Sequence, residues 1–355
     1  MKIAIDLTPL YGRKRTGVEM YAIDLYRALL TTGSEIAPIF HCQNEIDDNP
    51  NACIISKCNR LWLENVALSR TIRKIKADVV IFPIFPPPVD IYYGCKSKIY
   101  QTIHDTVFLR YRDTQNIAAK YYYLPKQKLA LKKIDGIITI SETVKHQLQE
   151  FTHRTIYNLG ENIAVEYQDA KSKIDIHLLD KWGMKENEYY ISVSTIEPRK
   201  NFDYLLEVIL PVLKQQKRKL VLVGRKGWGN NERLQKLIEQ AGESLIFTDY
   251  VSIEELFSLY HYAYAFALLS LDEGFGRTPF EAVACGCKRI ILSDIEIFHE
   301  TFEGNALFVS LDNEEKAREM FCQKELPQVS DDLNIPFDVL NERIQKIFMP
   351  FILSQ

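Results

Sequence analysis

The chain has 355 residues, 46% of them hydrophobic and 26% charged, with a formal net charge of −3 at pH 7. This length suits two domains, and this composition is ordinary for a globular enzyme. The slight negative charge argues against a nucleic-acid-binding protein, because such proteins present a strongly basic surface.

Two kinds of segment are missing from the sequence. No run approaches the ~18–20 consecutive apolar residues of a membrane-spanning helix. The N-terminus enters a strand-like run at residues 2–7 without the apolar core of a signal peptide.

Seven cysteines lie scattered at positions 42, 53, 58, 95, 285, 287 and 322. We expect reduced thiols in a cytoplasmic protein, and no metal site, because residues 285–287 lack a second ligand pair.

The chain opens with a strand, a loop and a helix. The strand covers residues 2–7, and helical spacing of apolar residues begins at Val18 and continues to Leu29. The loop at residues 11–17 is basic and ends in glycine. It contains no G-x-G-x-x-G, which weakens a dinucleotide-binding interpretation.

Two further strands are expected at residues 77–82 and 98–103. A rigid proline-rich loop follows the first, and His104 follows the second. Loops after the strands of an open α/β sheet line the ligand-binding crevice. We therefore expect His104 to face that crevice and to donate to a hydroxyl, although a structural histidine in a turn is the alternative.

Residues 110–133 combine many lysines and arginines with four tyrosines. A basic, aromatic helix can rest on an anionic membrane surface. An ordinary solvated helix face explains the same pattern, so both interpretations stay open. Another strand follows at 136–141, and the first half ends near residues 154–160.

After a charged transition at residues 165–188, the second half again reads strand, loop, helix. The strand covers 189–194, and apolar helical spacing resumes at Leu205. Arg199 and Lys200 stand together at the helix entrance, where the helix dipole is already positive. These cations would repel each other unless they share an anion, which favours a phosphate site over a basic surface turn.

The region at 262–294 carries the clearest motif. A strand over 262–270 and another over 288–293 flank a loop and a helix at 281–286, and earlier strands are expected at 219–224 and 245–251.

The loop contains Gly274 and Gly276, which let backbone N–H groups approach an anion closely. Glu273 and Glu281 flank it and could hold sugar hydroxyls. Thr278-x-x-Glu281 is also a possible capping box, which would explain Glu281 but not Glu273.

The run EGFGRTPFEAVACG at residues 273–286 resembles the signature of retaining glycosyltransferases of the GT-B fold, in the large family 4 group. The run EPRKN at 197–201 resembles the diphosphate-binding element of the same family. The resemblance covers most of the chain and is strongest over 189–306. Many members have glycine-arginine just upstream, where this chain has Ser194-Thr195, so Arg199 would compensate for a missing phosphate ligand.

The resemblance implies roles for individual residues. His104, Glu273, Arg199 and Lys200 would be catalytic, with His104 and Glu273 near the donor sugar and the two cations on the diphosphate. Glu281 would grip the ribose, and the backbone at Tyr250 and Val251 would read the nucleobase. The remaining donor-binding positions are Gly17, Gly274, Phe275, Gly276 and Thr278.

The alternating strands and helices predict two doubly wound α/β domains that face each other across a cleft. With the resemblance, this is the GT-B fold, made of two Rossmann-like domains. Residues 1–162 would form the acceptor-side domain and 163–335 the nucleotide-sugar-binding domain. Residues 336–355 would form a helix that returns to the first domain.

The implied function is retaining transfer of a hexose from a nucleoside-diphosphate sugar to a glycan or lipid-linked acceptor in surface polysaccharide synthesis. GDP-mannose is the favoured donor, and UDP- and dTDP-sugars stay open. No Asp-x-Asp motif occurs, so no metal or other cofactor is expected. We expect a cytoplasmic protein with possible peripheral contact with the inner membrane. Rival interpretations are a GT-B epimerase or phosphorylase, a non-catalytic sugar-binding subunit and, least favoured, a dehydrogenase.

Overall fold

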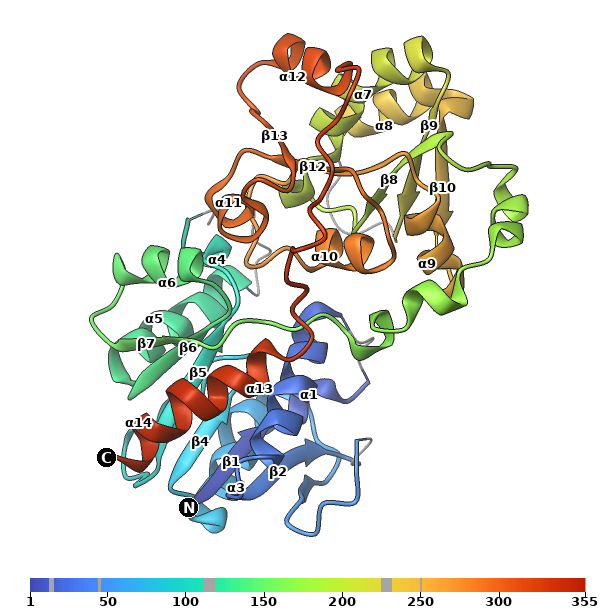
Figure 1. Ribbon diagram of the computed structural model, residues 1–355. Coiled ribbons are helices and arrows are strands. Elements are labelled where there is room, and N and C mark those ends of the chain that lie inside the picture. Colours follow the sequence, from blue (N-terminus) through green and yellow to red (C-terminus); the bar gives the residue numbers. More distant parts are fainter. Residues whose placement is uncertain (13–15, 44–45, 111–118, 225–231, 250, 355) are drawn as a thin grey trace. The chain divides into compact units, whose positions relative to one another are not determined.

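In the computed structural model, the chain forms two compact units, each built around one parallel sheet (Figure 1). The first unit comprises Met1–Asn162 and Asp338–Gln355, and the second comprises Ile163–Phe337. The structure describes residues 1–12, 16–43, 46–110, 119–224, 232–249 and 251–354.

The first unit contains a seven-stranded sheet with the order β3-β2-β1-β4-β5-β6-β7. Its strands are β1 (Lys2–Asp6), β2 (Glu35–His41), β3 (Cys53–Ile55), β4 (Val79–Phe82), β5 (Lys98–Ile103), β6 (Gly136–Thr139) and β7 (Thr155–Asn158). Every neighbouring pair is parallel; Ile3, for example, pairs with Ile36 on one side and Val79 on the other. The strands are nearly continuous apolar runs because both faces of the sheet are covered.

Short helices connect these strands. They are α1 (Gly17–Leu30), α2 (Arg60–Trp62), α3 (Leu68–Ile75), α4 (Val107–Arg110), α5 (Leu124–Lys133) and α6 (Glu142–Gln149). Single π-helical turns, η2 (Leu63–Ala67) and η5 (Ala119–Tyr123), precede α3 and α5. Short 3₁₀ turns occur at η1 (Thr8–Leu10) and η3 (Val89–Tyr92).

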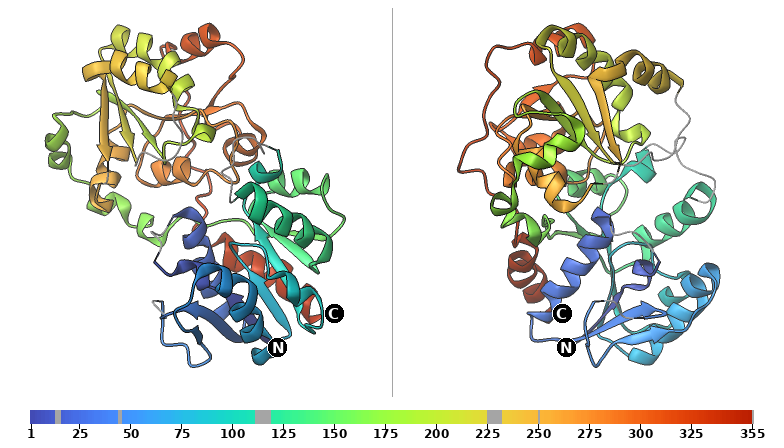
Figure 2. Two further views of the ribbon diagram at one scale, coloured as in Figure 1. Left: turned by 180° about the vertical axis from the view of Figure 1, so that it is seen from behind. Right: turned by 90° about the vertical axis from the view of Figure 1, so that its right-hand side faces the viewer.

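The C-terminal segment packs in the first unit, so both chain ends lie there (Figure 2). It runs through α13 (Val339–Arg343), the π-helical turn η11 (Ile344–Phe348) and α14 (Met349–Leu353), and α13 lies beside α1 (Figure 1). The ring of Phe348 is fully buried, with its centroid 5.2 Å from that of Tyr100 and 5.9 Å from that of Tyr157. These contacts attach the segment to β5 and β7.

The second unit contains a six-stranded sheet with the order β10-β9-β8-β11-β12-β13. Its strands are β8 (Tyr189–Val193), β9 (Lys219–Val223), β10 (Leu245–Asp249), β11 (Ala265–Leu268), β12 (Ile290–Ser293) and β13 (Leu307–Val309), all parallel. The predicted strand at 262–270 is therefore real but shorter, and the predicted strand at 245–251 ends at Asp249.

The second unit's α-helices are α7 (Phe202–Gln216), α8 (Glu232–Ala241), α9 (Ile253–His261), α10 (Arg277–Ala284), α11 (Glu296–Phe302) and α12 (Glu314–Phe321). Its 3₁₀ turns are η6 (Val165–Tyr167), η7 (Ala170–Lys173), η8 (Ile176–Trp182), η9 (Pro198–Lys200) and η10 (Gly242–Ser244). Along β8, Tyr190 faces one apolar cluster while Ile191 faces the other. The sheet is therefore covered on both faces, as in a doubly wound fold.

The order of strands reverses between β1 and β4 in the first sheet and between β8 and β11 in the second. At such a reversal the connections leave to opposite faces, and the loops at the carboxyl ends of the strands leave a crevice between them. In the second unit, this rule directs attention to the loops after β8 and β11.

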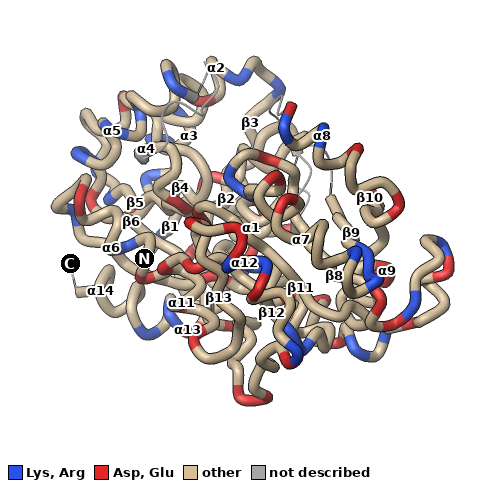
Figure 3. Tube along the Cα trace, turned by 90° about the horizontal axis from the view of Figure 1, so that it is seen from above, with Lys and Arg blue, Asp and Glu red and all other residues tan. Residues whose placement is uncertain are grey.

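In the part of the chain that the structure describes, no helix combines the length and apolar character needed to cross a membrane. All seven cysteines are free thiols. Acidic and basic residues are interspersed along the trace, with several lysines along α5 (Figure 3).

Candidate active site

The loops after β8 and β11 carry the residues of the two sequence motifs. The first loop ends in η9, which contains Arg199 and Lys200, and the second contains Glu273. Because β8 and β11 are neighbouring parallel strands, their carboxyl ends lie side by side. The fold thus brings together cations and a carboxylate that are more than 70 residues apart.

Glu273 forms ion pairs with both cations. Its Oε1 lies 2.5 Å from Lys200 Nζ, and its Oε2 lies 2.9 Å from Arg199 Nη1. The hydroxyl of Ser270 donates to Oε1 at 2.8 Å. Only 7% of the Glu273 side chain is exposed, so the pairs are shielded from solvent.

Arg199 makes further contacts that fix the second loop. Its Nη1 also donates to the backbone oxygen of Asp272 at 2.9 Å, and its own backbone oxygen accepts from Leu271 N at 2.8 Å. Its Nε and Nη2 both donate to Glu197 Oε1, at 3.2 and 2.9 Å. Arg199 therefore links the loop after β8 to the loop after β11.

The electrostatics of Glu273 follow from these contacts. Burial alone raises the pKa of its carboxyl, but the charges of Lys200 and Arg199 and the hydrogen bonds from Lys200 and Ser270 outweigh burial and lower the pKa to about 2. Glu273 is therefore ionised at neutral pH. It is also the anion that Arg199 and Lys200 share, so their mutual repulsion does not by itself require a bound phosphate.

The glycine loop leads directly into α10. Gly276 is the N-cap of this helix, with φ of 86°, which L side chains rarely adopt. A Cβ placed there would lie 2.7 Å from the ring of Phe298. Glycine is thus required both by the backbone and by the neighbouring α11, and it sets the direction in which the first N–H groups of α10 point.

The capping-box alternative for Glu281 is wrong. Because α10 begins at Arg277, Glu281 is the fifth helical residue. A capping-box acid belongs at the third position. The carboxylate of Glu281 must therefore be explained by contacts outside the helix.

Those contacts come from two tyrosines and one arginine. Oε2 of Glu281 accepts from the hydroxyls of Tyr167 at 3.2 Å and Tyr260 at 3.4 Å, while Oε1 lies 3.9 Å from Arg277 Nε. Burial raises the pKa of Glu281, while Arg277 and the two phenols act in the opposite direction. Glu281 is 13% exposed, so a ligand can still reach it.

Other predicted donor-binding residues belong to the same unit. Phe275 stacks on Phe280 with ring centroids 5.5 Å apart, Thr278 is half-buried in the first turn of α10, and Val251 is buried against the core. Tyr250 lies outside the described residues. The roles of these side chains and backbones in binding a nucleotide stay predictions.

Gly17 and His104 belong to the first unit. Gly17 is the first residue of α1. His104 follows β5, its Nε2 lies 2.8 Å from the carbonyl oxygen of Pro83, and its ring packs edge to face on Tyr21. Nε2 must donate in that contact, so in the neutral ring Nδ1 is an acceptor. A neutral His104 would therefore accept a hydrogen bond from a hydroxyl, whereas the sequence analysis expected it to donate.

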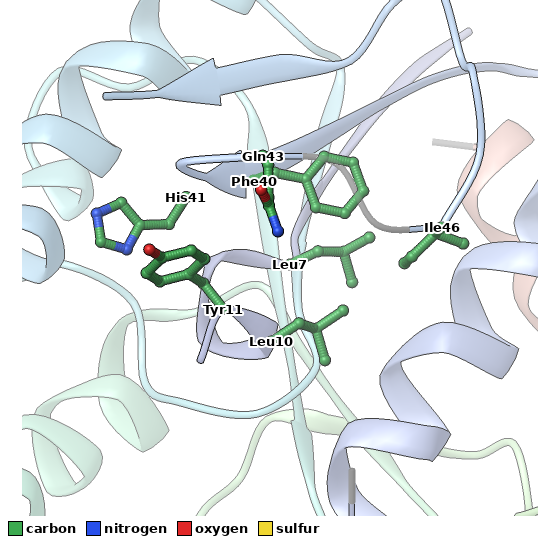
Figure 4. Close-up of a pocket in the computed structure, with 7 residues that line it drawn as sticks. All are labelled: Leu7, Leu10, Tyr11, Phe40, His41, Gln43 and Ile46. Carbon is green, nitrogen blue, oxygen red and sulfur yellow. The ribbon is translucent and has the colours of Figure 1, made fainter. Parts of the chain in front are cut away.

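A small pocket of the first unit lies at the carboxyl ends of β1 and β2 (Figure 4). It is mostly apolar and contains none of the residues that the sequence analysis selected. Its lining residues are Leu7, Leu10, Tyr11, Phe40, His41, Gln43 and Ile46. In Figure 4 the rings of Tyr11 and His41 lie close together, with centroids 5.0 Å apart.

Several residues of the site were not predicted from the sequence. Glu197 and Ser270 stand within three residues of predicted ones, so their spacing could have indicated them. Tyr167 is 114 residues from Glu281, and no local pattern connects the two. Within the described ranges, no group of three or more His, Cys, Asp or Glu residues could hold a metal ion.

Comparison with known proteins decides the family of the second unit. Residues 178–319, which include both loops of the site, match the family model described as glycosyl transferases group 1. The second unit contains a group 1 glycosyl transferase domain. The glycosyl transferase domain thus carries the ion cluster, the glycine loop and Glu281.

The chain is also similar to bacterial mannosyltransferases. It is 30% identical over 214 residues to the O-antigen chain mannosyltransferase RfbU of Salmonella typhimurium, covering 60% of this chain and 57% of the relative. It is 32% identical over 174 residues to the serotype-specific mannosyltransferase WbdA of Escherichia coli, covering 46% and 21%. The chain thus spans little more than half of RfbU and about a fifth of WbdA.

Solved structures confirm the fold over the whole chain. Anabaena HepE, whose structure holds UDP and glucose, superposes on this chain with a TM-score of 0.68 at 13% identity. The superposition covers 100% of each chain. Together with the two parallel sheets, this likeness confirms the predicted GT-B fold.

Proposed function

We propose that this protein is a retaining glycosyltransferase that transfers a hexose from a nucleoside-diphosphate sugar to a hydroxyl of a glycan or lipid-linked acceptor. The observation that carries the proposal is the ion-pair cluster in which Glu273 contacts both Lys200 and Arg199. This cluster lies next to the glycine loop, inside a group 1 glycosyl transferase domain. The similarity to O-antigen mannosyltransferases supports mannose as the sugar. GDP as the nucleotide is part of the proposal.

The reaction breaks the bond between the sugar's anomeric carbon and the diphosphate and forms a bond from that carbon to the acceptor oxygen. Negative charge grows on the leaving diphosphate, where Lys200 and the first N–H groups of α10 would stabilise it. The acceptor proton moves to an oxygen of the leaving phosphate. This route requires no protein nucleophile and no metal.

Glu273 has a defined part in the proposal. Its carboxylate stays ionised in a site shielded from water, and it orients Lys200 through a direct ion pair. When the donor is bound, Glu273 would accept hydrogen bonds from the sugar hydroxyls while Lys200 turns its other N–H groups to the phosphate. Glu281 would accept hydrogen bonds from the ribose.

Donor cleavage by the purified protein tests this proposal. We expect release of GDP from GDP-mannose, with UDP- and dTDP-sugars tested in parallel. Glu273→Ala and Lys200→Ala should each reduce the rate by roughly 100-fold or more. Lys200→Ala removes a cation that stabilises the leaving diphosphate, and Glu273→Ala removes the carboxylate that orients Lys200 and the sugar hydroxyls. Lys181→Ala is the matched control. Lys181 forms an ion pair with Glu255 in the same unit, and its side chain is 57% exposed.

Retention of full activity by both site variants would overturn the proposed site. Failure of the wild-type protein to cleave any donor, combined with tight binding of a sugar nucleotide, would favour the alternative of a non-catalytic binding subunit.

We further propose that the protein works at the cytoplasmic face of a membrane and contacts it through the basic, aromatic segment at 110–133. Residues 111–118 of this segment lie outside the described residues. In the described part, Lys120 is exposed and Tyr121 is 74% exposed, which supports this idea, whereas Lys126 is buried and cannot contribute. Flotation with anionic liposomes tests the proposal. Equal binding to anionic and neutral liposomes would contradict it.

A further inference from the structure

The carboxylate of Glu281 accepts hydrogen bonds from two tyrosine hydroxyl groups. Tyr167 in η6 and Tyr260 in α9 both donate to the same oxygen, Oε2, at 3.2 and 3.4 Å. These tyrosines come from two different elements, neither of which belongs to the glycine loop. The carboxylate is thus fixed by the surrounding fold as well as by its own helix.

The two tyrosines that contact Oε2 are more deeply buried than Glu281 itself. Tyr260 is 0% exposed and Tyr167 is 5% exposed, so a ligand cannot reach their hydroxyls easily. The Tyr167 ring is itself packed edge to face on Phe257, with centroids 5.1 Å apart. Glu281 is 13% exposed, and its other oxygen, Oε1, faces Arg277 Nε at 3.9 Å, beyond hydrogen-bonding distance.

We propose that Tyr167 and Tyr260 are positioning residues that hold Glu281 Oε2 inward so that Oε1 is presented to the ribose hydroxyls of the nucleotide. The proposal rests on the proposed function, in which Glu281 binds the ribose. A free glutamate side chain loses rotamer freedom when it binds a ligand. Two hydrogen bonds to the fold remove that freedom in advance and so strengthen ribose binding.

A purely structural role would be different. Two buried tyrosines need acceptors for their hydroxyls, and any buried carboxylate could serve. Under that role, loss of a hydroxyl lowers stability but leaves the preference for ribose over deoxyribose unchanged. Discrimination between the two sugars is therefore the deciding property.

The pH dependence gives a second readout. The groups that face Glu281 are Arg277, the two phenols and the Cys285 thiol, whose pKa burial raises. The phenols stabilise the ionised carboxylate. Their removal raises the pKa of Glu281 further, so ribose-dependent affinity is lost at a higher pH than in the wild type.

Affinities for GDP and 2′-deoxy-GDP, and for UDP and 2′-deoxy-UDP, should be measured by calorimetry for the wild type, Tyr167→Phe and Tyr260→Phe. We expect the wild type to prefer the ribonucleotide, and each variant to reduce that preference by about 3–10-fold, the range for one hydrogen bond. Tyr189→Phe is the matched control, because Tyr189 is 0% exposed and its hydroxyl donates to Leu259 O at 2.8 Å, away from Glu281.

An unchanged preference in a folded Tyr167→Phe or Tyr260→Phe variant would overturn this inference and leave the proposed function intact. A wild type that binds nucleotides without any preference would also overturn it. A wild type that binds no nucleoside diphosphate at all would overturn the proposed function itself, and this inference with it.

Discussion

At the scale of single residues, the site is a balanced set of charges. Glu273 shares its two oxygens between Lys200 and Arg199, and Arg199 shares its remaining donors with Glu197. Removal of one member of a shielded ion pair leaves the charge of its partner uncompensated. The resulting loss of folding free energy is larger than the free energy that the intact pair contributes. The stability of the second unit should therefore depend on Glu273 even without a ligand.

The first prediction is that Glu273→Gln lowers the free energy of unfolding at pH 7 by about 3–5 kcal/mol, because both cations lose their shared anion. Urea denaturation measures the loss. Glu342→Gln, which removes one partner of an exposed pair with Lys346, should change it by less than about 1 kcal/mol.

The second prediction concerns pH. The pKa of Glu273 is about 2 in the folded protein, below the usual 4.5, so its contribution is full above about pH 4.5 and is lost as pH falls towards 2. The difference in unfolding free energy between wild type and Glu273→Gln should shrink over that window. A difference that stays constant from pH 6 to pH 3 would show that Glu273 does not stabilise the fold through its charge.

At the scale of elements, the loop between β11 and α10 depends on glycine. Gly276 has a positive φ, and its missing Cβ makes room for the ring of Phe298. The first helical N–H groups can face an anion only if this turn is kept.

The third prediction compares two glycines with positive φ. Gly276→Ala should lower the unfolding free energy by roughly 1–3 kcal/mol, from backbone strain together with the overlap on Phe298. Gly183→Ala, at φ of 59° with nothing within 4 Å of the new Cβ, should cost less because it adds strain alone. Thermal denaturation separates them, and an equal loss for both variants would contradict the role of Phe298.

The sequence predicted the strand, loop and helix of this region correctly, but not the residue at which the helix begins. The run of apolar residues before Glu273 and the glycines after it predicted a strand, loop and helix, and all three exist. The helix begins at Arg277, four residues before the predicted range of 281–286, and its N-cap is Gly276 rather than Thr278. The capping motif misled because a local pattern cannot tell which of two neighbouring turns starts the helix.

The contacts between elements could not be predicted in the same way. The partnership of Arg199 with Glu197 follows from spacing in one short turn, whereas that of Glu281 with Tyr167 depends on how η6 packs against α9 and α10. Such packing depends on the three-dimensional arrangement of distant segments. A family resemblance transfers motif positions, and these tyrosines lie outside the motifs.

At the scale of the whole molecule, the chain forms two units, and its last helical segment completes the first of them. The residues at 338–355 contribute buried apolar side chains to that unit, including Leu340, Ile344 and Phe348, each 0% exposed. The first unit therefore depends on a segment that is synthesised after the second unit is complete.

The fourth prediction is that Phe348→Ala destabilises the first unit by about 3–5 kcal/mol through loss of its buried contacts with Tyr100 and Tyr157. Hydrogen exchange followed by mass spectrometry should show faster exchange in β5 and β7, with β8 to β13 unchanged. Ile347→Ala is the control, because Ile347 is 42% exposed in the same turn. Faster exchange throughout the second unit would contradict this division of the core.

In the proposed mechanism, the second unit binds the diphosphate of a sugar nucleotide at Lys200 and the start of α10. Calorimetric titration of GDP into the wild type and Lys200→Met tests it most directly. We expect saturable binding to the wild type and at least about a tenfold loss of affinity in the variant, since a charge-assisted hydrogen bond contributes roughly 1.5–3 kcal/mol. Equal affinity of the two proteins for GDP would contradict it.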